Sequence, residues 1–299
     1  MPRPALSATR AADILNFLAA HPTESFTLSD LASRLHVNMA SMHNVLAVLT
    51  DVGYLVRHPR HLTYALGPGV IAVGTAALEQ HPAIDRARDE IRNLSEALDV
   101  ELTVTARAGG DIVFLARAGR HQAASPVLHI GERAPLVPPF GSVFLAWSDT
   151  HEVDAWLARA PQAITDERRQ QLRELLGVVR RRLFAVSLHV PAIDRVGAAL
   201  DELATHHGAE HEATLQTALS ELVAGEYEVY EIEPARSYDG AQLSAPVFSP
   251  AGEVLVAITM TGLPHGVTGD EMIRYAHRLR DAALVVTKET HGKAPALTG

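Results

Sequence analysis

The chain of 299 residues contains no cysteine, which excludes disulfide bonds and zinc sites built on thiolates. Lysine is nearly absent too: only Lys288 and Lys293 occur, and arginine supplies the remaining positive charge. No apolar run approaches the ~20 residues of a membrane-spanning helix, and the N-terminal stretch lacks the apolar segment of a signal peptide. We therefore expect a soluble cytoplasmic protein that does not contact a membrane.

Several catalytic motifs are missing as well. The sequence has no G-x-S-x-G nucleophile elbow, no Walker loop and no dinucleotide-binding glycine fingerprint. The glycine clusters "ARAGG" and "GPGVIAVG" lack the strand-to-helix context that such motifs require. We expect no enzymatic activity and no cofactor, although a catalytic triad assembled in space would leave no signature along the chain.

The formal net charge of -9 counts against a dedicated nucleic-acid binder, because most such proteins are basic. The charge is uneven, however, and residues 1–78 are near neutral. The arginines of this segment are Arg3, Arg10, Arg34, Arg57 and Arg60, and its acids are Asp13, Glu24, Asp30 and Asp51. The acidity therefore belongs to the rest of the chain, which leaves the first segment able to approach DNA.

The first 67 residues have the periodicity of three helices followed by two short strands. Ser7 is the expected N-cap of the first helix, Thr27 and Asp30 stand at capping-box spacing for the second, and Asn38 is a favourable cap for the third. "YLVRH" and "HLTYALG" have the alternation of two strands. This order of elements predicts a winged helix-turn-helix.

A linker helix is predicted over 68–80, where a proline stands at a helix start. A second domain follows over 81–299, beginning with a long helix, "AIDRARDEIRNLSEALDV". Strands are predicted at "ELTVTAR", "DIVFLARAG", "SPVLHI", "EYEVYEIEPA", "AQLSAPVFS" and "EVLVAITMTG". Helices are predicted at "HEVDAWLARA", at 166–182, twice within 191–224, and at 268–289. The mixture predicts an α+β fold.

Several strings in this order resemble the IclR family of bacterial transcription regulators. In the first domain they are "TLSDLASRLHV", "HNVLAVLTDVGYLVR" and "YALGPGVIAVG". In the second they are "GERAPLVPPFGSVFLA", "LSAPVFSPAGEVLVAITMTG" and the terminal helix. The resemblance covers roughly residues 5–290, apart from about 190–238, and the second-domain strings make it more specific than a winged helix alone.

The resemblance implies a winged helix-turn-helix DNA-binding domain (1–67), a linker helix (68–80) and a C-terminal GAF-like α/β sensor domain (81–299) with a helical insertion at about 190–238. Members of the family bind pseudo-palindromic operators as dimers or tetramers, and a small organic effector binds the sensor domain. We accordingly expect a ligand-responsive repressor whose partners are a double-stranded DNA operator, a small organic effector and further copies of the chain.

In a helix-turn-helix the N-terminal half of the third helix enters the major groove. The residues expected to face DNA there are Met39, Ala40, Ser41, His43 and Asn44. This helix lacks Lys and Arg, whereas family members often have Lys or Ser near 39–40 and Arg at the position of Asn44. His43 keeps the family's histidine, and Asn44 is suited to pair with adenine. Expected phosphate contacts are Arg3, Arg10, Arg57, His58, Arg60 and His61.

An alternative remains open at this point. Winged helices also mediate protein contacts, so an uncharged third helix is compatible with a sensor or scaffold protein whose winged helix binds another protein rather than DNA.

The loop "GERAPLVPPFG" resembles the family loop over the effector cavity, and threonines stand where relatives often have serines on the last strand. The expected effector-binding residues are Leu128, Gly131, Phe140, Gly141, Ser142, Leu243, Ala245, Thr259 and Thr261. Loop N–H groups and the positive end of the helix "SVFLAW" are expected to favour a carboxylate. The loop is one residue shorter than usual, and the acidic stretch that usually follows the strand "LFAVSLHV" is replaced by Val190–Tyr238.

Two further patterns have ordinary interpretations. His207 and His211 stand four residues apart, a spacing that suits zinc, but Gly208 lies between them and no third ligand is evident beside them and His206. We expect a solvated junction and no metal. The run Arg180-Arg181-Arg182 favours a solvated helix face over a nucleic-acid contact.

Overall fold

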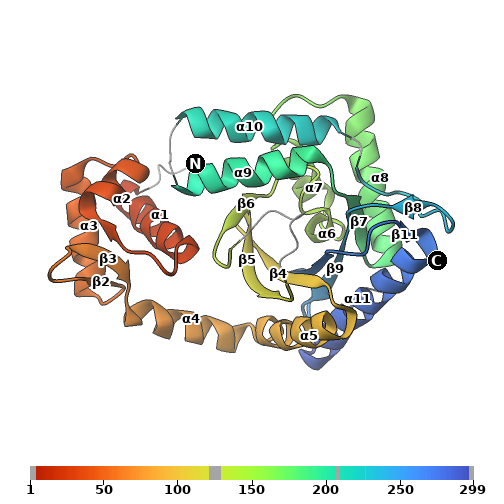
Figure 1. The fold of residues 1–299 in the computed structure, drawn as a ribbon, viewed down its shortest axis with the longest axis horizontal. Helices are drawn as coiled ribbons and strands as arrows, with labels where there is room; N and C mark the ends of the chain where they lie inside the picture. Colours follow the sequence, from red (N-terminus) through yellow and green to blue (C-terminus); the bar gives the residue numbers. More distant parts are fainter. Residues whose placement is uncertain (1–4, 121–128, 206–208, 226, 296–299) are drawn as a thin grey trace. The chain divides into compact units, whose positions relative to one another are not determined.

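The computed structural model describes residues 5–120, 129–205, 209–225 and 227–295. Its contacts divide the chain into two compact units. The first contains Met1–His81, His129–Glu132 and Ala198–Leu215, and the second contains Pro82–Leu128, Arg133–Gly197 and Gln216–Gly299. Figure 1 shows the helices and strands of each unit.

Residues 5–67 of the first unit form three helices and a small antiparallel sheet. The helices are α1 (Leu6–Ala20), α2 (Leu28–Arg34) and α3 (Met39–Asp51). The strands are β1 (Phe26–Thr27), β2 (Leu55–Arg57) and β3 (Thr63–Leu66), in the order β1-β3-β2. Side chains from all three helices and from β2 form one buried cluster that includes Ile14, Leu31, Leu46 and Leu55. The predicted winged helix-turn-helix order is therefore confirmed.

The helix caps agree with the sequence at two of three positions. The Thr27 Oγ1 accepts the Asp30 N–H at 3.2 Å, and an Asp30 carboxylate oxygen accepts the Thr27 N–H at 2.9 Å, which completes the capping box. The Asn38 side chain accepts the Ser41 N–H at 2.9 Å. The prediction for Ser7 was wrong: α1 begins at Leu6, so Ser7 lies inside the first turn, where its backbone is already helical.

We expect Thr27→Ala to lower the free energy of unfolding by about 1 kcal/mol, the usual cost of losing an N-cap. Its hydrogen bonds also hold the pKa of Asp30 below its ordinary value of 3.8. A lowered pKa stabilises the fold above that value and the stabilisation is lost as pH falls through the folded-state pKa. Denaturant titrations over a series of pH values should thus show the difference from wild type shrinking below pH 3.8. The control is Ser33→Ala on the exposed side of α2, and an equal, pH-independent loss in both variants would contradict the prediction.

The linker helix α4 (Pro68–Gln80) begins and ends where the sequence predicts. It buries none of its residues within the single chain. Ile71 and Val73 are 68% and 53% exposed, so this helix offers apolar surface to another molecule.

The second unit is built on a six-stranded antiparallel sheet in the order β6-β5-β4-β10-β9-β7. The strands are β4 (Glu101–Ala108), β5 (Asp111–Ala118), β6 (Arg133–Pro135), β7 (Ala185–Leu188), β9 (Ala241–Phe248) and β10 (Val254–Thr261). The short strands β8 (Ser237–Tyr238) and β11 (Val267–Thr268) pair separately. The predicted α+β class is confirmed.

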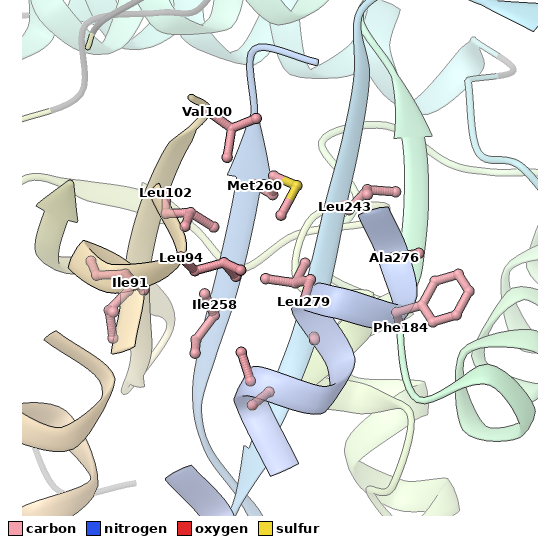
Figure 2. Close-up of a cluster of buried hydrophobic side chains, with 14 of the residues drawn as sticks. Ile91, Leu94, Val100, Leu102, Phe184, Leu243, Ile258, Met260, Ala276 and Leu279 are labelled. Atoms are coloured by element: carbon pink, nitrogen blue, oxygen red, sulfur yellow. The ribbon is translucent and has the colours of Figure 1, made fainter. Parts of the chain in front are cut away.

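Helices pack on both faces of this sheet. α5 (Pro82–Leu98) and α11 (Gly269–Glu289) pack on one face, in a cluster that includes Leu94, Leu102, Ile258 and Leu279 (Figure 2). α6 (Ser142–Leu145), α7 (Thr150–Leu157) and α8 (Asp166–Arg182) form the second cluster, which reaches the sheet at Ile112 and Ala257. Because side chains alternate along a strand, β5 and β10 contribute buried residues to both clusters.

Two more helices follow β7: α9 (Pro191–Thr205) and α10 (Ala209–Ala224). Arg195 and Glu221 join them through an ion pair of 2.7 Å. Both helices within 191–224 are thus confirmed.

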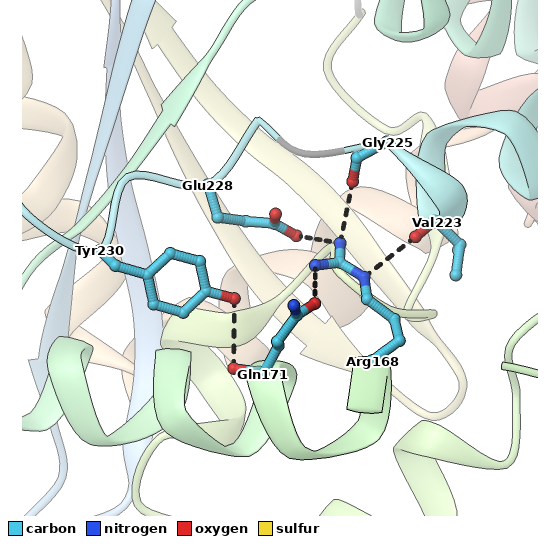
Figure 3. A network of polar contacts seen from close by, with 6 residues as sticks. All are labelled: Arg168, Gln171, Val223, Gly225, Glu228 and Tyr230. Atoms are coloured by element: carbon cyan, nitrogen blue, oxygen red, sulfur yellow. Dashed lines mark hydrogen bonds and ion pairs between the residues drawn. The ribbon is translucent and has the colours of Figure 1, made fainter. Parts of the chain in front are cut away.

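Arg168 of α8 anchors the chain that leaves α10 (Figure 3). Its guanidinium donates to the carbonyl oxygens of Val223 and Gly225, both at 3.1 Å, and to the Glu228 carboxylate at 2.8 Å. The Tyr230 hydroxyl donates to the carbonyl of Gln171. Burial, with Glu228 nearby, raises the pKa of Tyr230 to about 12, so this hydroxyl stays protonated.

Two predicted strands differ from the structure. The described end of "SPVLHI", His129-Ile130, is not a strand, and the strand at this place is β6, three residues further on. The described part of "EYEVYEIEPA", residues 227–235, forms only an isolated bridge between Glu228 and Ser187, although Tyr227 and Val229 alternate with Glu228. Two main-chain hydrogen bonds join this segment to β7: the Leu188 N–H donates to the carbonyl of Tyr227, and the Val229 N–H donates to the carbonyl of Val186. Beyond these contacts the segment is a loop. Among the described residues, no helix combines the length and apolar character needed to cross a bilayer.

Candidate nucleic-acid interface and ligand-binding face

The first half of α3 presents a surface of mixed polarity without Lys or Arg. Met42, Leu46 and Leu49 point into the core of the winged helix, and the opposite side of the helix is exposed. Of the predicted contact residues, Met39, Ala40, His43 and Asn44 are exposed and Ser41 is half-buried. The connection from α2 to α3 runs from Leu35 to Asn38, and the N–H groups of its first three residues donate to carbonyl oxygens of α2. It is the tight turn of a helix-turn-helix.

The hairpin of β2 and β3, which follows α3 directly, carries several basic side chains. Arg57, His58, Arg60 and His61 are all exposed. The Arg57 guanidinium lies 5.6 Å from the centre of the Tyr64 ring, which orients it along the hairpin. The His58 Nδ1 accepts the N–H groups of Arg60 (3.2 Å) and His61 (3.1 Å), so the tip of the hairpin is folded around one imidazole. Sequence reasoning did not anticipate this contact.

The two other predicted phosphate contacts, Arg3 and Arg10, come from the start of the chain. Arg10 lies on α1 and is half-buried, and Arg3 lies outside the described residues. Arg34, which the sequence did not single out for DNA, stacks over Phe26 with 5.1 Å between the guanidinium carbon and the ring centre.

In the second unit, the sheet face toward α6–α8 becomes polar at the end where β10 stops. Directly opposed residues on neighbouring strands point to the same face. In the middle of the sheet, Thr259 lies opposite Thr103 on one side and Ser244 on the other, and Arg117 lies opposite Thr103. Glu101 lies opposite Thr261. At the β7 edge, Ser187 lies opposite Gln242 and Glu228. We call these nine side chains the polar face. Ser244 and Thr259 share a hydroxyl hydrogen bond of 2.9 Å, and most of the other members are half-buried.

The loop predicted to cover a ligand packs against this side of the sheet. The Phe140 side chain is half-buried on the cluster of α6–α8, and its carbonyl accepts the Trp156 Nε1–H at 3.0 Å. Gly141 has φ of 80°, and a Cβ there would lie 2.1 Å from a methyl carbon of Leu136. Only glycine therefore suits this position, which immediately precedes Ser142 at the start of α6.

Not all predicted effector residues come together. Thr259 and Thr261 belong to the polar face, and Phe140, Gly141 and Ser142 lie in the loop and helix on the same side. Leu243 and Ala245 do not, because they alternate with Ser244 and are fully buried with α5 and α11 on the opposite face. The expectation that they line the same site was wrong. Leu128 lies outside the described residues, and Gly131 falls in the other unit.

The expected helix dipole is also small. α6 has only four residues, so few peptide dipoles align toward a ligand at Ser142. Sequence reasoning missed Thr103, Ser244 and the ion pair of Glu101 with Arg117. The alternation in "QLSAP" predicts that Ser244 and Leu243 point to opposite faces of the sheet. Which residue of the neighbouring strand pairs with Ser244 depends on the strand register.

The two remaining patterns have these outcomes. His206 and His207 lie outside the described residues. The residues that the structure describes contain no cluster of three metal-ligating side chains. Arg180 and Arg181 are exposed at the end of α8, as a solvated face would be, whereas Arg182 turns inward to donate to the carbonyl of Val229 at 3.2 Å.

The fold and these two surfaces define a helix-turn-helix regulator with a separate C-terminal unit. Residues 7–59 match the family model of the IclR helix-turn-helix domain, and residues 75–189 match that of the bacterial transcriptional regulator IclR C-terminal domain. The chain belongs to the IclR family of bacterial transcriptional regulators. The second match ends at residue 189, just before α9.

Individual relatives are distant. The chain is 27% identical over 127 residues to the HTH-type transcriptional regulator BhcR of Paracoccus denitrificans, covering 42% of this chain and 45% of that protein. The matches span about half the length of the curated relatives.

Solved structures share the fold over nearly the whole chain. An IclR transcriptional regulator from Alicyclobacillus acidocaldarius aligns with a TM-score of 0.66 and 19% identity, covering 96% of this chain and all of the other. An IclR homologue from Microbacterium hydrocarbonoxydans, complexed with 4-hydroxybenzoate, aligns with a TM-score of 0.64 and 16% identity, covering 95% and 98%.

Proposed function

We propose that this regulator is a ligand-responsive repressor in the cytoplasm, which binds a pseudo-palindromic operator as a dimer or tetramer. The observation that carries the proposal is the capped helix α3, which presents His43 and Asn44 beside a hairpin bearing Arg57 and Arg60. Asn44 has the two polar groups needed to pair with adenine, and Met39 or Ala40 suits a thymine methyl group. His61 and Ser41 supply further hydrogen bonds, and Arg3 before α1 and Arg10 on α1 add positive charge.

An α3 without Lys or Arg lowers the expected affinity for DNA, and oligomerisation offsets this loss. Phosphate contacts release counterions, so a helix without arginine contributes little to affinity by this route. A second subunit doubles the hairpin contacts. The exposed Ile71 and Val73 of α4 support such an assembly, because apolar side chains on a linker helix are stabilised by burial against another copy.

The C-terminal unit, which we propose is GAF-like, binds the effector on the polar face. Thr259 and Thr261, together with Phe140, Gly141 and Ser142, form the expected contact set. The 4-hydroxybenzoate bound to a solved relative supports a small organic ligand. Effector binding regulates DNA binding only if the ligand prefers one arrangement of the winged helices over another.

Salt dependence tests the DNA-binding proposal directly. We expect Arg60→Ala to weaken binding to a duplex from the promoter beside the gene and to reduce the salt slope by about 0.9 for each phosphate that Arg60 neutralises. Fluorescence anisotropy at several salt concentrations measures both quantities. Arg173→Ala is the matched control, because that arginine is exposed on α8 and paired with Asp154. Equal slopes for wild type and Arg60→Ala would place the hairpin away from the phosphates.

One observation favours the alternative that the winged helix binds protein. Val48, Val52 and Val56 are 61%, 56% and 47% exposed, and they continue the outer side of α3 into β2. Such residues suit an apolar partner better than phosphates. If no promoter duplex is bound at low salt while Val48→Asp abolishes a protein contact, the alternative replaces the proposal.

A further inference from the structure

The charges of the polar face are already balanced within the chain. Arg117 and Glu101 form an ion pair of 2.6 Å, with side chains 23% and 5% exposed. At the β7 edge, Arg168 and Glu228 form a second pair of 2.8 Å, with side chains 12% and 4% exposed. Both pairs are partly or fully removed from water, where Coulomb interactions are strong. Each arginine is therefore neutralised before any ligand arrives.

A carboxylate ligand would be repelled by the glutamates that already pair with the two arginines. Bound to Arg117, it would bring a second carboxylate close to Glu101 around one guanidinium, and like charges in a buried site repel. The same holds for Arg168 and Glu228. Arg107 of β4, whose partner Ile112 faces α6–α8, is itself paired with Glu152 at 3.1 Å. Arg120, beyond the end of β5, is exposed, so water screens its charge.

The dipoles of the covering loop do not supply the missing positive charge. A single-turn helix such as α6 contributes little macrodipole. The other groups between the two ion pairs are neutral: Thr103, Ser187, Gln242, Ser244, Thr259 and Thr261. Hydroxyls and amides both donate and accept hydrogen bonds, so they match hydroxyl, ester and carbonyl groups as well as any ion.

We infer that the polar face selects an uncharged ligand bearing hydroxyl or carbonyl groups, such as an alcohol, a phenol, an ester or a lactone, rather than an organic acid. Glu101 and Glu228 act as specificity-determining residues, because each occupies an arginine that would otherwise bind a carboxylate. This inference rests on the proposed effector site, but it names the ligand class, which that proposal leaves open.

Matched probes test the inference with the full-length protein. The pairs are benzoate with methyl benzoate, 4-hydroxybenzoate with its methyl ester, and hexanoate with its methyl ester, each titrated calorimetrically. We expect the neutral member to bind about tenfold more tightly, the effect of one unfavourable charge contact. A carboxylate that binds as tightly as its ester, and binds more weakly in Thr259→Val, would overturn the inference while leaving the effector site intact. If Thr259→Val changes the binding of no probe, the effector site itself is misplaced and the inference falls with it.

A change of charge should reverse the preference. In Glu101→Gln the Arg117 guanidinium is freed, and we expect the carboxylate of each pair to gain about tenfold relative to its ester. The matched control is Asp154→Asn, which frees the exposed Arg173 and should leave the ratio unchanged. Circular dichroism melting shows whether Glu101→Gln is folded, and Glu228→Gln gives the same expected direction independently. A folded variant of either kind with an unchanged ratio would contradict the assignment.

Discussion

Arg168→Met is expected to lower the free energy of unfolding by about 3–5 kcal/mol, because it leaves the Glu228 carboxylate buried without its partner. Glu228 has a side chain only 4% exposed, so water cannot replace the missing cation. The carbonyl oxygens of Val223 and Gly225 lose donors at the same time. The segment after α10 is thus the first part of the second unit that should loosen. Urea titration followed by circular dichroism measures the change.

Two comparisons make this result specific to the buried pair. Arg173→Met removes an arginine of the same helix from an exposed pair with Asp154, and we expect a loss of at most about 1 kcal/mol. The double variant with Arg168→Met and Glu228→Leu should be more stable than Arg168→Met alone, since no uncompensated charge remains. If Arg168→Met costs no more than Arg173→Met, the network in Figure 3 does not anchor this segment.

The second large effect concerns Asn44. If α3 lies in the major groove, Asn44→Ala removes a bidentate base contact worth about 1–3 kcal/mol in each half-site. For a dimer on a palindromic operator the loss is about 2–6 kcal/mol, which corresponds to about 30-fold or more in the dissociation constant. Non-specific DNA binding should change little, because it depends on phosphate contacts. Competition of the operator against unrelated DNA, followed by anisotropy, separates the two.

The control for Asn44 is Val48→Ala, one helical turn further along the same outer side of α3. It removes exposed apolar surface and no hydrogen-bonding group, so specific binding should stay within about threefold of wild type. A folded Asn44→Ala protein that keeps full discrimination between operator and unrelated DNA would exclude this residue from base recognition. Equal losses in both variants would instead indicate a general disturbance of α3.

The winged helix was predictable because its signals are local. The capping box of Thr27 and Asp30 and the cap at Asn38 each depend on residues within one turn of a helix, and both were found as expected. The linker helix follows from the proline near its start and its apolar composition. Ser7 failed as a cap because the helix begins two residues earlier, with Ala5 as its N-cap, which no local pattern forbids.

The ligand-binding face was only partly predictable because it depends on pairings between distant strands. Thr259 and Thr261 could be chosen from their place on the last strand. Leu243 and Ala245 were chosen from a neighbouring strand without knowledge of its register, and a shift by one residue moves every side chain to the other face. The partners of Thr259 are Thr103 and Ser244, which lie 156 and 15 residues away along the chain.

The amino-acid sequence by itself determined the helices of the winged helix-turn-helix, the linker and the family, because caps, periodicity and short motifs act over a few residues. Tertiary structure alone decided which arginines are neutralised and which hydroxyls share a face. Those properties arise from contacts such as Arg168 with Glu228, whose partners are far apart in the chain and meet only when helix and sheet pack.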